Sequence, residues 1–334
     1  MKFFDLFAGI GGFRLGLERC GHKCISSCEI DRYCVGVYNH NFRESNRPND
    51  VRKLDATSLP EFDILTAGFP CQSFSVAGQR LGFNDTRGTL FFEIARIARE
   101  KRPSILFLEN VKGLLGHDNG KTFGTILNTL YDLGYDVEWQ VINGKYFVPQ
   151  SRERVFIIGH LREKPTAPVF PITDGYQVDD STLSQTQTDG SRIRSPYTRT
   201  IDYNYWKGGG SRTMILMSHS KANIKKRIQD RDSTWSLDTS GDLMAIVDCG
   251  SSRDRVYDKN GLSPSLVTPA GGRAQPKIIE HEKIRKLTPL ECERLMGFPD
   301  NWTKVGDISD TQRYKMLGNS VIPGIIEFIG KKIK

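Results

Sequence analysis

Residues 63–72 read DILTAGFPCQ, an apolar run that ends in a thiol. The stretch from Ile64 to Ala67 has the length of a buried strand, and open α/β sheets hold their chemistry just beyond the carboxyl ends of strands. Gly68 and Pro70 allow the backbone to approach a ligand closely and then turn away. Cys71 is therefore placed as a reactive thiol, although a cysteine taken alone is more often a small core residue.

Strand-like and helix-like segments alternate through the first part of the chain. The pattern predicts strands at residues 2–7, 24–28, 64–67, 105–109, 137–142 and 155–159, and helices that begin near residues 13 and 31 and cover 89–101 and 122–133. This alternation is typical of an α/β fold with a doubly wound, mostly parallel sheet and helices on both faces. We expect that fold for the larger part of the chain.

A change in composition after about Pro165 predicts a second domain. The sequence there becomes rich in Pro, Ser, Thr, Asp and Gly. Helical patterning returns at Thr288, which can cap a helix whose first residue is Pro289, and again at residues 325–329. We expect the α/β domain to comprise residues 1–178 and 305–334, and a smaller, loop-rich domain to comprise residues 179–304.

The 334-residue chain carries a formal net charge of +8, and the excess lies in one segment. Residues 192–231 contain ten Lys and Arg against two Asp, with four aromatic side chains and a run of three glycines. This composition suits a nucleic acid, and a solvated basic face is the alternative. No segment has the pattern of a secretion signal or a membrane span, so we expect a cytoplasmic protein without a membrane partner.

Seven cysteines without repeated close spacing indicate reduced thiols rather than a disulfide framework. Cys20, Cys24, Cys28 and Cys34 lie close together in the sequence, but their gaps lack the paired spacing of zinc sites. We therefore interpret these cysteines as buried structural residues and expect no metal.

Residues 5–12 form a glycine-rich turn between the first strand and the first helix. Backbone N–H groups at such a helix start can bind a cofactor, and Glu29, at the end of the second strand, is placed to accept both hydroxyls of a ribose. Arg14 stands where the dinucleotide fingerprint requires a third glycine, so a pyrophosphate is not indicated. An adenosine cofactor without a pyrophosphate fits best, with S-adenosylmethionine as the candidate and a plain tight turn as the alternative.

Seven ordered blocks resemble the motifs of the cytosine-C5 DNA methyltransferases, specifically the compact bacterial enzymes of restriction-modification systems. The blocks are residues 5–12 with Glu29, then 50–51, 68–72, 109–111, 150–154, 285–291 and 318–321. The resemblance implies a class I S-adenosylmethionine-dependent methyltransferase fold. It also implies that residues 179–304 form a target-recognition domain with its hinge, because this family has its variable region there.

A covalent mechanism follows from the resemblance. In it the Cys71 thiolate adds to C6 of a cytosine, which makes C5 nucleophilic, while a protonated Glu109 neutralises charge at N3. Arg152 would hold the O2 side of the base and orient Glu109, with Arg154 in support. The alternatives are that Glu109 is a capping or surface acid and that the two arginines are solvated charges.

The same resemblance assigns a cofactor site. Phe7 and Ile30 would cover the two faces of the adenine and Glu29 would bind the ribose, although Phe7 could also be a simple core residue. The other residues of this site would be Gly9, Ile10, Gly11, Gly12, Asp50, Val51, Gly68, Pro70, Leu90, Asn319, Ser320 and Val321.

Double-stranded DNA is the substrate that the resemblance implies. A thiol cannot reach C6 inside a stacked duplex, so the target cytosine must rotate out of the helix. Gln72 and Ser75 match positions that contact DNA, in a loop whose small residues suit a lid. Arg255 is the candidate for a bidentate guanine contact and Ser265 for a phosphate contact.

We therefore predict a DNA (cytosine-5-)-methyltransferase that acts as a monomer on a short duplex site and is functionally paired with a restriction endonuclease. The alternatives are a tRNA cytosine-C5 methyltransferase, an inactive DNA-binding module and a nicotinamide-dependent dehydrogenase. The long variable region favours DNA over tRNA. An inactive relative should lack Cys71 or Glu109, and a dehydrogenase gives neither residue a role.

Overall fold

The computed structural model describes residues 1–69, 90–164, 166–172 and 283–334, and the short segments 236–237, 243–244, 246–247, 256–257, 263–266 and 277–280. Contacts divide the chain into two compact units. The first unit is Met1–Asn143, Glu153–Lys207 and Val321–Lys334, and the second is Gly144–Arg152 and Gly208–Ser320. The domain boundaries expected after residues 178 and 304 stay a prediction.

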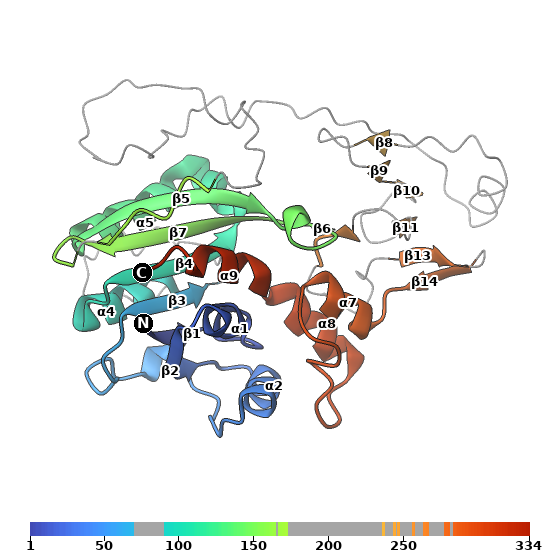
Figure 1. Ribbon diagram of the computed structural model, residues 1–334, viewed down its shortest axis with the longest axis horizontal. Coiled ribbons are helices and arrows are strands. Elements are labelled where there is room, and N and C mark those ends of the chain that lie inside the picture. The colour runs from blue at the N-terminus through green and yellow to red at the C-terminus, as the bar shows by residue number, and fades with distance from the viewer. Residues whose placement is uncertain are drawn as a thin grey trace. The chain divides into compact units, whose positions relative to one another are not determined.

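The first unit is an α/β sheet with its helices (Figure 1). Its strands are β1 (Lys2–Leu6), β2 (Lys23–Cys28), β3 (Ile64–Gly68), β4 (Ile105–Val111), β5 (Tyr135–Asn143) and β7 (Glu153–Leu161). Its α-helices are α1 (Gly12–Arg19), α2 (Arg32–Phe42), α4 (Leu90–Lys101), α5 (Lys121–Asp132) and α9 (Pro323–Gly330), and its 3-10 helices are η1 (Val51–Lys53) and η3 (Lys112–Gly120).

The strands of this sheet run in the order β2-β1-β3-β4-β7-β5. The pairs β1–β2, β1–β3 and β3–β4 are parallel, and β7 is antiparallel to both β4 and β5. The prediction of a doubly wound, mostly parallel sheet is thereby confirmed. Strand β4 does not end at Glu109 as expected, because it stays paired with β7 as far as Val111, opposite Arg154.

Alternate residues of the central strands are buried under helices on opposite faces. Leu106 and Leu108 of β4 belong to one hydrophobic cluster with buried side chains of α4 and α5, such as Ile94 and Ile126. Phe107, between the two leucines, meets Phe13 of α1 edge to face, with 5.1 Å between the ring centroids. Because successive side chains of a strand point to opposite faces, helices cover both sides of the sheet.

The second unit holds shorter elements. They are η4 (Gly144–Tyr146), β6 (Gln150–Ser151), β8 (Ser236–Leu237), β9 (Leu243–Met244), β10 (Ile246–Val247), β11 (Val256–Tyr257), β12 (Ser263–Pro264), β13 (Lys277–Glu280), β14 (Lys283–Lys286), α7 (Pro289–Leu295) and α8 (Asp310–Asn319). Thr288 caps α7 in a capping box with Glu291, and Pro289 is the first helical residue, as the sequence predicts. No helix among the described residues is long and apolar enough to cross a membrane.

A buried ion pair holds α7, α8 and the segment between them together. The Glu293 side chain is fully buried, and its Oε1 accepts hydrogen bonds from the Thr303 backbone N–H at 2.9 Å and from Arg313 Nη2 at 3.1 Å. The Thr303 hydroxyl donates to the same oxygen. The Arg313 side chain is only 10% exposed, and it also pairs with the exposed Asp310 at 3.3 Å.

Replacing Glu293 with alanine is expected to destabilise the protein by about 3–5 kcal/mol, because it leaves the buried guanidinium of Arg313 with only the exposed Asp310 as an ionic partner. Urea unfolding followed by circular dichroism would measure this loss. Arg294→Ala is the control, since it removes an ion pair with Asp300 in which the side chains are 60% and 48% exposed. Equal losses for the two variants would contradict the prediction.

Candidate active site

Three residues of the turn after β1 have positive φ values, and one of these positions has no room for a Cβ atom. Phe7, Gly9 and Gly11 have φ values of 55°, 53° and 86°. A Cβ atom at Gly11 would lie 2.2 Å from Cε2 of Phe42, so the turn is pressed against α2. Positive φ is costly for a bulky residue such as Phe7, and strained residues of this kind gather at functional sites.

Glu29 lies beside this turn, at the end of β2. Its Oε2 accepts a hydrogen bond from the Gly9 backbone N–H at 2.8 Å, and its Oε1 accepts from the N–H groups of Ile30 and Asp31, each at 2.8 Å. The Ile30 side chain is 59% exposed, which is unusual for an isoleucine next to a buried strand. The Glu29 carboxylate therefore lies next to the exposed apolar side chain of Ile30.

The segment after α2 leads to Asp50, which caps the 3-10 helix η1. Asp50 accepts a hydrogen bond from the Arg52 backbone N–H and pairs with the Arg52 guanidinium at 2.6 Å. The hydrogen bonds from Arg52 lower the pKa of Asp50 to about 2. Val51 is buried, and its carbonyl accepts a hydrogen bond from Arg96 of α4 at 2.9 Å.

Glu109 lies opposite Gly68 in the β3–β4 pair, at the carboxyl end of the sheet. A Cβ atom at Gly68 would lie 3.5 Å from Glu109 Oε2, 3.6 Å from the Phe13 ring and 3.8 Å from Val321. Arg154 of β7 pairs with Glu109 at 3.1 Å between Nε and Oε1, and the two side chains are only 15% and 10% exposed. Burial lowers the pKa of Arg154, and the charge of Glu109 opposes that change.

The chain that leads to Cys71 is held at this same edge of the sheet. Asn110 is buried, and its Nδ2 donates to the Phe69 carbonyl at 2.9 Å. Cys71 itself lies outside the described residues. Gly68, three residues before it in the sequence, is in register with Glu109.

Comparison with protein families identifies these features. The model of the C-5 cytosine-specific DNA methylase family matches residues 1–334. The chain belongs to this family. Membership confirms the resemblance seen in the sequence, including the fold and the enzyme class.

Bacterial Type II methyltransferases are similar to the chain over its whole length. The Type II methyltransferase M.HhaI of Haemophilus parahaemolyticus is 35% identical over 336 residues, which cover 100% of this chain and 94% of that protein. The Type II methyltransferase M.HpaII of Haemophilus parainfluenzae is 39% identical over 344 residues, covering 99% and 88%. A crystal structure of the S. pombe Dnmt2 methyltransferase covers 98% of this chain and 96% of its own at 18% identity, with a TM-score of 0.62, and shows the same fold.

Arg152 and Arg154, the two arginines of the block at residues 150–154, lie in different surroundings. Arg152 is 3% exposed and belongs to the second unit, where it donates to the carbonyls of Leu266, Gly318 and Ser320 at 3.3, 3.0 and 2.7 Å. Arg154 contacts Glu109 within the first unit. The role expected for Arg152, which is to hold the O2 side of the base and orient Glu109, stays a prediction.

The remaining predicted site residues are distributed as follows. Leu90 begins α4, Asn319 ends α8, and Ser320 and Val321 follow it. The Ser265 hydroxyl donates to the Ser151 carbonyl at 3.0 Å within the second unit, and its expected contact with a phosphate stays a prediction. Pro70, Cys71, Gln72, Ser75 and Arg255 lie outside the described residues, as does the basic segment 192–231.

The cysteines and possible metal ligands among the described residues form neither a disulfide nor a metal cluster. Cys28 and Cys34 are buried, while Cys20 and Cys24 are half-buried. Burial raises the pKa of the Cys28 thiol to about 12, so this thiol is not activated.

A buried polar network, which the sequence analysis missed, lies behind the glycine-rich turn. Asp5 is fully buried in β1 and accepts hydrogen bonds from the Thr66 hydroxyl at 2.9 Å and the Tyr38 hydroxyl at 3.4 Å. The guanidinium of Arg14 lies over the ring of Phe42, 4.3 Å from its centroid, and reaches the Tyr38 hydroxyl at 3.5 Å. A charged residue within the strand pattern Phe-Phe-Asp-Leu was the available signal.

Burial raises the pKa of Asp5 to about 7 from its ordinary value of 3.8, while the Thr66 hydrogen bond and the charge of Arg14 oppose the shift. Between these two pH values the folded protein keeps a proton that the unfolded chain has lost. The free energy of unfolding therefore falls as pH rises from about 4 to about 7, and the contribution does not change further above that range.

Asp5→Asn removes this titration. We expect the variant to gain stability relative to the natural protein as pH rises through that window, by a total on the order of 4 kcal/mol. Urea unfolding of both proteins at several pH values between 4 and 8 would measure the difference. Parallel stability curves for the two proteins would contradict the prediction.

Proposed function

We propose that this protein transfers a methyl group from S-adenosylmethionine to C5 of a cytosine within a short, specific site in double-stranded DNA. The product would be S-adenosylhomocysteine, and the methylated DNA would resist a paired restriction endonuclease. The Type II methyltransferases that resemble the chain support this role. The observation that carries the proposal is the meeting of Glu109, Arg154 and Gly68 at the sheet edge that leads to Cys71.

The residues at the ends of β1 and β2 fit an adenosine ligand. Glu29 offers carboxylate oxygens to a ribose, at the cost of the bonds that they now accept from backbone N–H groups. Ile30 exposes an apolar side chain for one face of the adenine, and the half-buried Phe7 lies at the turn for the other. Asp50 and Val51 present the edge that would read the base. No phosphate-binding turn is needed for such a ligand.

S-adenosylmethionine supplies an electrophilic methyl group on a sulfonium. The protein must make C5 of cytosine nucleophilic enough to accept it. In our proposal the Cys71 thiolate adds to C6, and the displaced ring electrons move toward N3, where Glu109 supplies a proton. The resulting enamine carries electron density at C5. After methylation, a water molecule accepts the C5 proton as the C5–C6 double bond forms again and the Cys71 thiolate leaves, and N3 returns its proton to Glu109.

Arg154 holds Glu109 in a defined position, and it also affects when Glu109 can take up a proton. An ion pair stabilises the ionised carboxyl group, so Glu109 must take up its proton as the base enters, when N3 of cytosine lies against it. We assign the orientation of Glu109 to Arg154, since their side chains are in contact and nearly buried. The guanidinium keeps further donors for the O2 side of the base.

The cytosine must leave the duplex to reach this site. A sheet edge with a buried acid and a thiol cannot approach C6 of a stacked base, so the proposed chemistry requires base flipping. Gln72, Ser75, Arg255 and Ser265 stay as proposed DNA contacts. Monomeric action and pairing with an endonuclease are likewise part of the proposal.

Bisulfite sequencing of a plasmid incubated with the protein and S-adenosylmethionine tests the function. We expect protection of one cytosine within every copy of one short sequence, and no protection elsewhere. Transfer of a labelled methyl group to duplex DNA and to tRNA should be compared in parallel. Label on tRNA alone, or none on either substrate, would overturn the proposal.

A further inference from the structure

The loop between α2 and η1 carries the chain from a helix end to Asp50. Residues 43–50 have no regular secondary structure, and most of their side chains are exposed. The loop starts where Arg43 adopts a left-handed conformation with φ of 56°, after which Glu44 pairs with Arg14 at 2.9 Å. It ends where the Asn49 backbone N–H donates to the Glu29 carbonyl at 2.7 Å. Its position therefore depends on contacts with its surroundings.

The side chain of Asn39 holds the middle of this loop. Asn39 Nδ2 donates to the Asn46 carbonyl at 2.9 Å, and the Asn46 backbone N–H donates to Asn39 Oδ1 at 3.0 Å. One amide side chain thus satisfies both backbone groups of Asn46, as a neighbouring strand would. The helix α2 supplies a rigid base for this pair.

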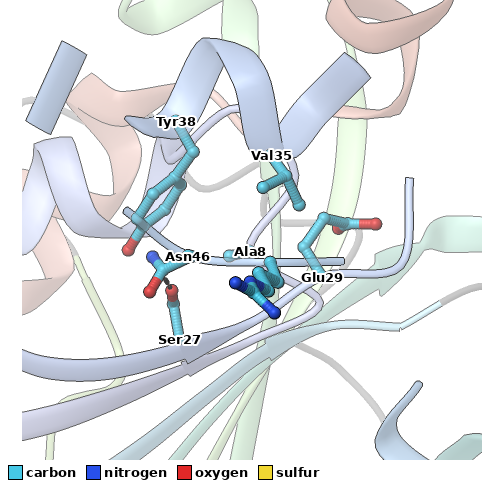
Figure 2. A pocket seen from close by; sticks show the side chains of 7 residues that line it. Ala8, Ser27, Glu29, Val35, Tyr38 and Asn46 are labelled. Carbon is cyan, nitrogen blue, oxygen red and sulfur yellow. Dashed lines mark hydrogen bonds between the residues drawn. The ribbon is translucent and has the colours of Figure 1, made fainter. Parts of the chain in front are cut away.

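The side chain of Asn46 connects the loop to the sheet. Its side-chain Nδ2 donates to the Ser27 hydroxyl of β2 at 3.0 Å, as Figure 2 shows. Asn46 and Arg47 then form part of the wall of a pocket that is also lined by Glu29 and Tyr38. The loop is therefore fixed to α2 and to β2 beside the proposed ribose-binding carboxylate.

We propose that Asn39 is a positioning residue for cofactor binding. It fixes the loop whose last residue, Asp50, faces the adenine edge in the proposed function, on which this inference rests. Loss of the Asn39 side chain frees the Asn46 backbone and lets the segment before Asp50 move. The affinity for the adenosine part of the cofactor falls, while the chemistry at Glu109 is unaffected.

The test is calorimetric binding of S-adenosylhomocysteine combined with steady-state methylation. Asn39→Ala removes two hydrogen bonds, and we expect the Kd to rise about tenfold. KM for S-adenosylmethionine should rise in parallel, with kcat unchanged. Asn46→Ala removes the bond to Ser27 but keeps both backbone bonds to Asn39, so its effect should be only about two- to threefold.

Asn41→Ala is the matched control on the same helix. Its amide donates to the Val37 carbonyl within α2, and its replacement should leave the Kd unchanged. Thermal melting without cofactor verifies that each variant is folded. A Kd for Asn39→Ala equal to that of the natural protein would overturn the inference and leave the proposed function standing. Failure of the natural protein to bind the ligand would overturn both.

A double-mutant cycle with Asp50→Ala tests the route of the effect. If Asn39 acts by positioning Asp50, the Asn39→Ala change should cost much less affinity in a protein that already lacks the Asp50 side chain. Additive losses in the double variant would show that Asn39 acts by another route, and would also overturn the inference.

Discussion

Cys71→Ala is expected to reduce methyl transfer by at least about 10⁴-fold, because without the thiolate nothing adds to C6 and C5 stays a poor nucleophile. The side chain is small, and the chain before it is fixed by the Asn110 bond to the Phe69 carbonyl. Binding of S-adenosylhomocysteine and of duplex DNA should therefore persist. Transfer of labelled methyl groups in single-turnover experiments measures the loss.

Cys20→Ala is the matched control, since Cys20 lies at the end of α1 and its thiol donates to backbone carbonyls of Gly16 and Glu327. This variant should keep full activity. A duplex with 5-fluorocytosine at the target position should trap the natural protein, because fluorine cannot leave as the C5 proton does. Strong turnover by Cys71→Ala, or an adduct at a peptide other than that of Cys71, would exclude the proposed mechanism.

Glu109→Gln should lower kcat by roughly 10³-fold while leaving the KM for S-adenosylmethionine nearly unchanged. Glutamine has the same shape, and it can still donate a hydrogen bond to N3, but it cannot transfer a proton. It also leaves the guanidinium of Arg154 without its carboxylate in a site where that side chain is 15% exposed. The kcat of both proteins across a pH range would separate the loss of a proton donor from a loss of folding.

Glu153→Gln provides the comparison for this variant. Glu153 directly precedes Arg154 on β7 and makes an exposed pair with Lys112 at 3.0 Å. Its replacement should change kcat by less than about twofold. Similar losses for the two variants would mean that charge near the strand end, and not a proton from Glu109, accounts for the effect.

Local patterns in the sequence predict much of the first unit. The starts of α1 and α2 and the strand predicted at residues 64–67 follow from apolar periodicity and from the glycine-rich turn after the first strand. These patterns extend over only a few residues, so they can be interpreted without knowing the structure of the rest of the chain. The need for glycine at position 11 is different, because the side chain that excludes a Cβ atom there is that of Phe42 in α2.

Contacts between distant segments could not be predicted in this way. Asn39 looks like an ordinary helical residue, and its partner Asn46 is identified only by the path of the loop. Asp5 meets Thr66 and Tyr38 because three separate elements converge there. Hydrogen-bond partners of buried polar groups are chosen by tertiary geometry, and the sequence contains no local signal for them.

The two arginines show most clearly where sequence reasoning reaches its limit. The sequence alone determines the family, the thiol, the acid and the presence of Arg152 and Arg154 two residues apart, a spacing that would place both on one side of a continuous strand. The strand is not continuous, because β6 ends at Ser151 and β7 begins at Glu153, and the chain passes from one unit to the other between the two arginines. Only the tertiary structure decides that Arg154 meets Glu109 in the sheet, since pairing of β7 with β4 fixes its position, while Arg152 is buried among carbonyls of the second unit.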